Sequence, residues 1–245
     1  MPACLIALGA NLGDPLSTLM DAAHAVGALP GVQLLRVSRM IDSEPIGGPP
    51  GQPRFANAAA TIETSTPPHE LLFGLHTVEQ RFGRRRRERW DARTLDLDLL
   101  LYDDHVGADA GVQTPHPRMT FRPFVMIPAA EIAGDWVHPL LGKTLAELDQ
   151  LRTAGGNQIV LRDASAELGD AVRRCVADHG PAVVTEAGVE DPPARLTICC
   201  GPPAPLPGAG PTLWLAADAT AEEQQREVHA AVECVWPGLP AAEGH

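Results

Sequence analysis

The segment 94–102, with the sequence TLDLDLLLY, limits most strongly how this chain can fold. Side chains along a β-strand point alternately to opposite faces, so Asp96 and Asp98 share one face while Leu95, Leu97 and Leu99 share the other. The leucine face suits a hydrophobic core. The two aspartates, with their Cα atoms roughly 6.5–7 Å apart, need water, cations or a metal ion. The segment therefore predicts a strand that is buried on one face and open on the other.

The paired carboxylates of Asp96 and Asp98 have two interpretations. Carboxylate oxygens are suitable ligands for Mg²⁺, which prefers oxygen and keeps part of its water shell. Alternatively, both side chains face solvent on an edge strand at no energetic cost. The strand alone does not decide between these two possibilities.

A run of arginines comes directly before this strand, in the segment 81–93. Guanidinium groups stay charged and bind phosphate oxygens through two parallel hydrogen bonds. A polyphosphate that carries Mg²⁺ would therefore satisfy both the arginines and the carboxylates. The alternative is a solvated basic loop in an acidic protein. After Arg81, the arginines that lead into the strand are Arg84, Arg85, Arg86, Arg87, Arg89 and Arg93.

His116 lies between two prolines in the segment TPHPRM, and Arg118 and Arg122 follow closely. The prolines restrict the backbone, which fixes the position of the imidazole at low entropic cost. A single histidine more often has a structural role. The neighbouring cations make a contact with a ligand the alternative.

Several aromatic side chains could bind a flat ligand. Phe55 and Phe124 either belong to the core or stack on a planar heterocycle. Asn57 offers such a ring both a donor and an acceptor. Trp90 either anchors the arginine loop or covers the ligand. The loop GANLGDP at 9–15 lacks the P-loop pattern, so a nucleotide would have to be bound in another way.

Hydrophobic periodicity predicts an α+β fold for the first part of the chain. Proline begins the first two expected helices, and glycine or a Pro-Gly pair ends them. The order β-α-β-β-α-β is the split βαβ, or ferredoxin-like αβα, arrangement. The expected strands are 4–8, 32–39, 55–64 and 94–102; the expected helices are 15–29, 68–82, 124–132 and 144–151.

The character of the sequence changes at about residue 155. The remaining segments follow the order β-α-β-β-β-α and are numerous enough for a small domain. We therefore expect one domain over 1–155 and a small α/β domain over 156–245. The second region has no phosphate loop, paired carboxylates or metal-ligand spacing, which favours a packing or interaction role.

Composition restricts the partners and the compartment. The net charge of -12 argues against a general binder of nucleic acid or of anionic membranes. No apolar run approaches the roughly 18–20 residues of a membrane helix, and the N-terminus lacks the basic leading region of a signal peptide. The five cysteines show no C-x-x-C spacing, so neither a disulfide framework nor a zinc site is predicted. We expect a cytoplasmic protein that acts on small molecules.

Four separated motifs resemble those of the 6-hydroxymethyl-7,8-dihydropterin pyrophosphokinase family. They are ALGANLGD, SEPIGG followed by RFANAA, RERWDARTLDLDLLLY and TPHPRMTFRPF, and they lie in about residues 3–150. The third motif is the most specific. The resemblance implies a ferredoxin-like fold that transfers diphosphate from MgATP to the hydroxymethyl oxygen of the pterin. The reaction releases AMP and belongs to tetrahydrofolate synthesis.

The resemblance also implies a role for individual residues. Asp96 and Asp98 would bind two Mg²⁺ ions that bridge the phosphates of ATP. The arginine loop would act on the transferred group, although the choice among Arg85, Arg86 and Arg87 stays open. The implied catalytic residues are Arg84, Arg86 and Arg93; the nucleotide contacts are Glu79, Arg89, His116 and Arg122; the pterin contacts are Phe55, Phe124, Asn57, Trp90 and the backbone of Ser43 and Ile46.

Two other functions are consistent with parts of the sequence. A ferredoxin-like sheet with a basic loop could bind RNA, but this gives no reason for the paired aspartates. A regulatory pseudoenzyme could bind a partner through residues 156–245. The presence of Asp96, Asp98, Arg89 and Arg93 together argues against a pseudoenzyme.

Overall fold

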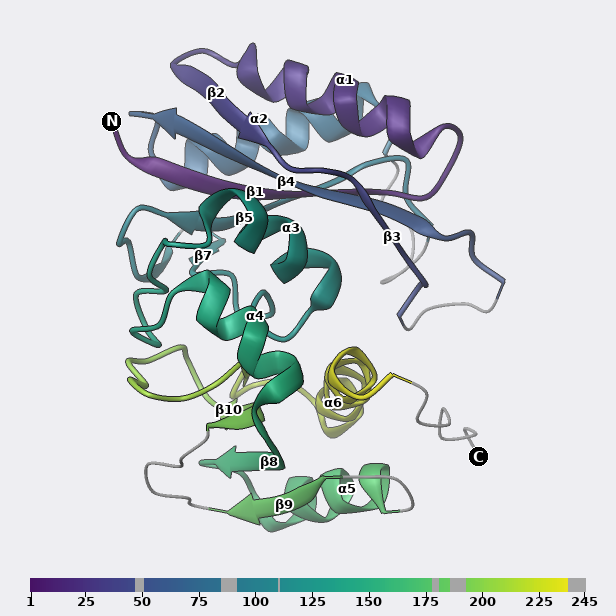
Figure 1. Cartoon of the computed structure of the whole chain (residues 1–245), viewed down its shortest axis with the longest axis vertical. Coiled ribbons are helices and arrows are strands. Elements are labelled where there is room, and N and C mark those ends of the chain that lie inside the picture. Colours follow the sequence, from purple (N-terminus) through teal and green to yellow (C-terminus); the bar gives the residue numbers. More distant parts are fainter. Residues whose placement is uncertain (47–50, 85–91, 110, 178–180, 186–192, 238–245) are drawn as a thin grey trace.

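The structure is a computed structural model that describes residues 1–46, 51–84, 92–109, 111–177, 181–185 and 193–237. Within these ranges it contains a five-stranded sheet, a two-stranded hairpin and a four-stranded sheet. Figure 1 shows the five-stranded sheet at one end of the molecule and the four-stranded sheet at the other. None of the described helices has the length and apolar character needed to cross a membrane.

The five-stranded sheet is built from the first part of the chain and is antiparallel throughout. Its strands have the order β2-β4-β1-β5, and the short strand β3 pairs with β4. The expected combination of helices and sheets is confirmed, whereas β3 was not predicted. The elements are β1 (Ala3–Ala10), α1 (Pro15–Gly27), β2 (Val32–Val37), β3 (Ile41–Ser43), β4 (Phe55–Thr64), α2 (Pro68–Arg81) and β5 (Asp96–Tyr102).

Local sequence explains how the two helices of this region begin and end. Asp14 caps α1 by accepting a hydrogen bond from the backbone N–H of Ser17, and a proline follows it at the first helical position. Gly83, with a φ of 79°, ends α2 in a backbone conformation that favours glycine. Leu16 and Met20 have the helical spacing of the buried residues of α1, but both are exposed to solvent.

Alternating side chains of the central strands supply two different cores. Ile6 of β1 packs toward α1 and α2, whereas its neighbour Leu5 packs in the core formed by α3 (Pro123–Ala133) and α4 (Leu145–Ala154). Figure 1 shows α1 and α2 on one side of the sheet and α3 on the other. A hairpin that was not predicted, β6 (Gly107–Asp109) and β7 (Val112–Thr114), follows β5.

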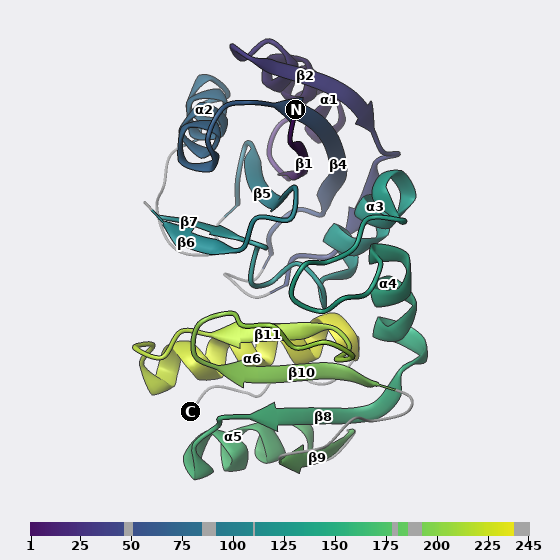
Figure 2. The same cartoon turned by 90° about the vertical axis from the view of Figure 1, so that its left-hand side faces the viewer.

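The four-stranded sheet is parallel and has the strand order β11-β10-β8-β9. Two helices share a hydrophobic core with the strands, and Figure 2 shows them beside this sheet. The predicted order of elements after residue 155 is present. The elements are β8 (Gly156–Arg162), α5 (Ala166–Val176), β9 (Ala182–Thr185), β10 (Ala194–Cys200), β11 (Thr212–Leu215) and α6 (Ala221–Val235).

The opposite face of the parallel sheet packs against the region around α3 and α4. Trp214 of β11 belongs to the same core as these helices. His138 is fully buried and stacks on Trp214, with the two rings 7° from parallel and their centroids 6.2 Å apart. Neither ring nitrogen of His138 has a hydrogen-bond partner among the described residues. Burial lowers the pKa of His138 to about 4, so the imidazole is neutral in the folded chain.

This burial makes the stability of the fold depend on pH. As the pH falls from 6.5 to about 4, the unfolded chain binds a proton at His138 that the folded chain excludes, so the free energy of unfolding decreases. The variant His138→Leu should lose this dependence. Relative to neutral pH, the wild type should lose roughly 2 kcal/mol more than the variant at pH 5.

The measurement is urea unfolding of both proteins at several pH values. Substitution of His69, which is exposed on α2, by Gln is the matched control and should leave the slope unchanged. Equal slopes for wild type and His138→Leu would show that His138 is not protonated on unfolding.

Candidate active site

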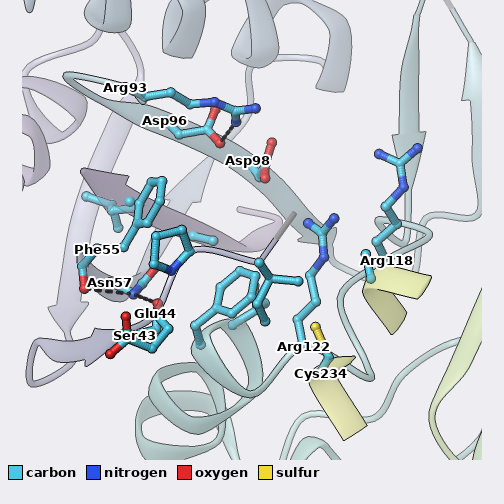
Figure 3. Close-up of a pocket in the computed structure, with 18 of the residues that line it drawn as sticks. Ser43, Glu44, Phe55, Asn57, Arg93, Asp96, Asp98, Arg118, Arg122 and Cys234 are labelled. Atoms are coloured by element: carbon cyan, nitrogen blue, oxygen red, sulfur yellow. Dashed lines mark hydrogen bonds and ion pairs between the residues drawn. The ribbon is translucent and has the colours of Figure 1, made fainter. Parts of the chain in front are cut away.

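A cavity of about 250 Å³ is lined by residues from both of the long central strands of the antiparallel sheet. Its walls come from β1, β3 and the segment after it, β4, β5, the loop 115–122 and α3. The last described helix, α6, also contributes. Figure 3 shows the side chains that line it. The described lining residues that the sequence predicted are Ser43, Ile46, Phe55, Asn57, Arg84, Arg93, Asp96, Asp98, His116, Arg122 and Phe124.

The strand β5 places both aspartates at the cavity, as its alternating sequence predicts. Leu97 is buried in the core between them, whereas Asp96 and Asp98 are partly exposed on the cavity face. On the neighbouring strand β1, Gly9 pairs with Asp96 and Ala7 pairs with Asp98. Because these two neighbours have little or no side chain, they leave space in front of the carboxylates.

Two arginines hold Asp96 in place. Arg93 forms an ion pair with one carboxylate oxygen of Asp96, and Arg84 approaches the other at 2.5 Å. Figure 3 shows the contact between Arg93 and Asp96, with Asp98 further along the same strand. The predicted proximity of the arginines and the carboxylates is therefore present for these residues. The other predicted residues of this loop, Arg86, Arg89 and Trp90, lie outside the described residues.

Glu79 does not line the cavity but supports it from behind. Its side chain is buried, accepts a hydrogen bond of 2.8 Å from the backbone N–H of Leu97 and forms an ion pair with Arg84. Burial raises the pKa of Glu79, while the backbone N–H and Arg84 act in the opposite direction. One carboxylate thus connects α2, β5 and the start of the arginine loop.

His116 is held in one tautomer. Its Nδ1 accepts a hydrogen bond of 3.2 Å from the backbone N–H of Arg118, so in the neutral ring the proton is on Nε2. Burial, together with the cations of Arg122 and Arg118, lowers the pKa of His116 to about 3. At neutral pH His116 is therefore an uncharged hydrogen-bond donor at the cavity wall.

The side of the cavity away from Arg122 is flat and polar. Phe55 lines it, and the side-chain amide of Asn57 donates a 3.0 Å hydrogen bond to the hydroxyl of Ser43. The second ring of the lining, Phe124, has its centroid 5.8 Å from the guanidinium of Arg122. Figure 3 shows Phe55, Asn57 and Ser43 on the side of the cavity away from Arg122. This side of the cavity offers an aromatic surface and the polar side chains of Asn57 and Ser43.

Some lining residues carried no signal in the sequence. Arg118 was considered only as a neighbour of His116, although it lines the cavity itself. Ala230 and Cys234 come from α6, in the region predicted to have a packing role. Burial raises the pKa of Cys234 to about 12, so this residue is a neutral thiol in the wall.

The carboxylates of the cavity fit a magnesium ion that a bound ligand also coordinates. No group of three or more His, Cys, Asp or Glu side chains able to hold a metal occurs among the described residues. Mg²⁺ is commonly bound through one or two carboxylates together with substrate phosphates. Asp96 and Asp98, with arginines beside them, match this pattern. The cavity thus combines a region for a magnesium-bound polyphosphate with a region for a planar heterocycle.

Comparison with known proteins agrees with this geometry. Residues 5–134 match the family model described as 7,8-dihydro-6-hydroxymethylpterin-pyrophosphokinase, or HPPK. The chain belongs to this family. The matched segment includes β5 and the loop 115–122, and it ends before α4.

Individual relatives give the same assignment. A 2-amino-4-hydroxy-6-hydroxymethyldihydropteridine pyrophosphokinase from Synechocystis sp. is 43% identical over 144 residues, which are 59% of this chain and 73% of the relative. The protein of the same name from Haemophilus influenzae is 42% identical over 134 residues, which are 55% of this chain and 83% of the relative. A crystal structure described as HPPK-DHPS in complex with substrates superposes with a TM-score of 0.48 and 10% identity, over 81% of this chain and 57% of that one. That superposition adds nothing to the family assignment.

The arrangement around Glu79 leads to a stability prediction. Glu79→Gln keeps the size of the side chain but removes the buried charge that balances Arg84. The variant should lose roughly 2–4 kcal/mol of unfolding free energy. Urea denaturation measures this loss, with Glu70→Gln as the control because Glu70 is exposed on the same helix. If both variants unfold at the same urea concentration, Glu79 does not connect these elements.

Proposed function

We propose that this chain transfers a diphosphate group from MgATP to 6-hydroxymethyl-7,8-dihydropterin, giving AMP and the pterin diphosphate in folate synthesis. The observation that carries the proposal is one cavity whose lining brings together the carboxylates of β5, several arginines and two phenylalanines. The family match over residues 5–134 supports it. Two relatives above 40% identity are named for this pyrophosphokinase.

The fold assignment belongs to the same proposal. The antiparallel order β2-β4-β1-β5, with helices after the first and third long strands, supports a ferredoxin-like arrangement for the first domain. The start of β8 at Gly156 supports a boundary between domains 1–155 and 156–245. The core around α5 and α6 also supports it, because nearly all of its buried residues come from 156–245.

Asp96 and Asp98 are the residues that would hold two Mg²⁺ ions. Bound Mg²⁺ neutralises charge on the phosphates of ATP and stabilises the leaving AMP. Arg84 and Arg93 contact the two carboxylate oxygens of Asp96 and hold it at the cavity, and the phosphates of the nucleotide would compete with Asp96 for these arginines. Asp98 is two residues further on the same face of β5.

The arginines supply the remaining positive charge. Phosphoryl transfer depends mainly on positioning and on stabilising charge at the equatorial oxygens, and it does not require a strong general base. Arg84 and Arg93 are close enough to the β5 carboxylates to contact the transferred group. Arg86 has the corresponding catalytic role and Arg89 contacts the nucleotide; both lie outside the described residues.

His116 and Arg122 act on the nucleotide. The neutral imidazole of His116 donates through Nε2 to a phosphate oxygen, and it does so without competing with the arginines for charge. The guanidinium of Arg122 lies 5.8 Å from the ring centroid of Phe124, which fixes its direction by a cation–π interaction. Glu79 acts indirectly, by holding Arg84.

The pterin occupies the flat end of the cavity. Phe55 and Phe124 stack on its two faces, and Asn57 reads its polar edge together with the backbone of Ser43 and Ile46. Trp90, which lies outside the described residues, is the remaining pterin contact of the proposal. No described feature favours the RNA-binding alternative. RNA binding would also give Asp96 and Asp98 no role. The absence of nucleic-acid and membrane partners, and a cytoplasmic location, stay predictions.

The reaction and its metal ligands can be tested in one assay. The purified protein is incubated with MgATP and 6-hydroxymethyl-7,8-dihydropterin, and AMP and pterin diphosphate are measured. Asp96→Asn and Asp98→Asn should each reduce the rate by roughly 100-fold or more, because each removes a carboxylate at the point where phosphate charge must be neutralised. Asp104→Asn, in the exposed turn after β5, is the control and should keep the wild-type rate.

Equal amounts of AMP and pterin diphosphate are expected from the wild type. ADP instead of AMP would contradict diphosphate transfer. Full activity of both aspartate variants would contradict their role as metal ligands.

A further inference from the structure

The helix α6 forms a wall of the cavity although it lies outside the segment that matches the family. Ala230 and Cys234 line the cavity, and both are buried. Figure 3 shows Cys234 on this helix beside Arg122, at the arginine end of the cavity and away from Phe55. The family match ends at residue 134. The second domain therefore contacts the nucleotide end of the proposed site.

The loop 115–122, which carries His116 and Arg122, is tied to the second domain by a buried two-way contact. The hydroxyl of Thr120 donates to the backbone carbonyl of Thr212 at 3.1 Å and accepts from its backbone N–H at 2.8 Å. Both threonines are fully buried. Breaking this contact would leave polar groups without water or a partner, which is costly.

Apolar packing reinforces the same connection. Phe121 is almost fully buried and belongs to the core of the second domain, together with Val228 and Val232 of α6. The guanidinium of Arg122 lies 5.9 Å from the ring centroid of Phe121. The second domain thus holds one of the two rings that orient Arg122.

One charged contact joins α6 directly to a cation of the cavity wall. Nε of Arg118 lies 2.8 Å from a carboxylate oxygen of Glu227. Only 8% of the Glu227 side chain is exposed, compared with 30% of the Arg118 side chain. A buried carboxylate needs a cationic partner, so Glu227 restricts the long and otherwise adaptable side chain of Arg118.

We infer that the second domain completes the nucleotide end of the site, and that Glu227 is a positioning residue that orients Arg118 toward the phosphates of ATP. The inference rests on the proposed function. An arginine that is already oriented loses less conformational entropy when it binds phosphate. The opposite role, in which the carboxylate competes with phosphate for Arg118, predicts tighter nucleotide binding once Glu227 is neutralised.

The test compares full-length Glu227→Gln with Glu222→Gln. Glu222 lies on the same helix, its side chain is 82% exposed, and it faces Arg226 at 3.7 Å. We expect Glu227→Gln to raise the KM for MgATP roughly tenfold, because a charge-assisted contact is lost. The KM for the pterin should change less than about twofold, and Glu222→Gln should match the wild type.

A double variant shows whether the effect of Glu227→Gln requires Arg118 or comes from a general loss of structure. If Glu227 acts through Arg118, the double variant Arg118→Gln/Glu227→Gln should have the same KM for MgATP as Arg118→Gln alone. Effects that add, an equal rise in both KM values, an unchanged KM or a lower KM for MgATP would each overturn the inference. A wild type that makes no AMP would instead overturn the proposed function.

A second pair of variants keeps the test decisive if Glu227→Gln does not fold. Ala230→Leu enlarges a residue of the cavity wall, and Ala221→Leu makes the same change at an exposed position of α6. Binding of α,β-methylene-ATP with Mg²⁺ is measured by calorimetry. Weaker binding by Ala230→Leu than by Ala221→Leu is expected, and equal binding would show that α6 does not border the nucleotide.

Discussion

The buried carboxylate of Glu79 is the contact on which the arrangement of the site depends. It binds the backbone of β5 through the N–H of Leu97 and the side chain of Arg84. Arg84 in turn contacts Asp96. A charge with so little access to water is stable only when its partners are fixed, so helix, strand and loop must adopt their positions together. The geometry of the proposed metal ligands is thus a consequence of core packing behind them.

The net charge of the side chains that line the cavity is opposite in sign to the net charge of the chain. The chain has a net charge of -12, yet Arg84, Arg93, Arg118 and Arg122 all line one cavity. Three carboxylates, those of Glu44, Asp96 and Asp98, also line it, so the four arginines leave a small excess of positive charge that attracts anionic ligands. An acidic surface elsewhere repels other polyanions, which favours a small anionic substrate over an extended one.

Sequence reasoning was most reliable where the pattern of side chains is set by the backbone period. The alternation of Asp96, Leu97 and Asp98 predicted both the buried and the open face of β5. The bounds of β4 were predicted to the residue, because proline-containing, turn-forming segments enclose the strand on both sides. Leu16 was misleading, since helical spacing identifies a stripe of apolar residues but not how far the core extends across it.

Contacts between distant segments could not be predicted in this way. The pairing of Arg118 with Glu227 joins residues whose neighbours in sequence give no indication of each other. The same holds for Thr120 and Thr212, which are ordinary polar residues until their buried contact is seen. The motifs therefore located the arginine and aspartate part of the site, but not the wall that α6 adds.

The place of α6 in the chain also affects how the protein is made. Synthesis proceeds from the N-terminus, and domains generally fold as they emerge. The antiparallel sheet, with its aspartates and its first arginines, is available long before residue 234 has been added. During that interval the hydrophobic surface of Phe121, which later packs against α6, has no cover from this helix. Until translation is nearly finished, the nascent chain therefore exposes apolar surface beside a cavity whose wall is incomplete. Association with other molecules through this surface must be avoided during that interval.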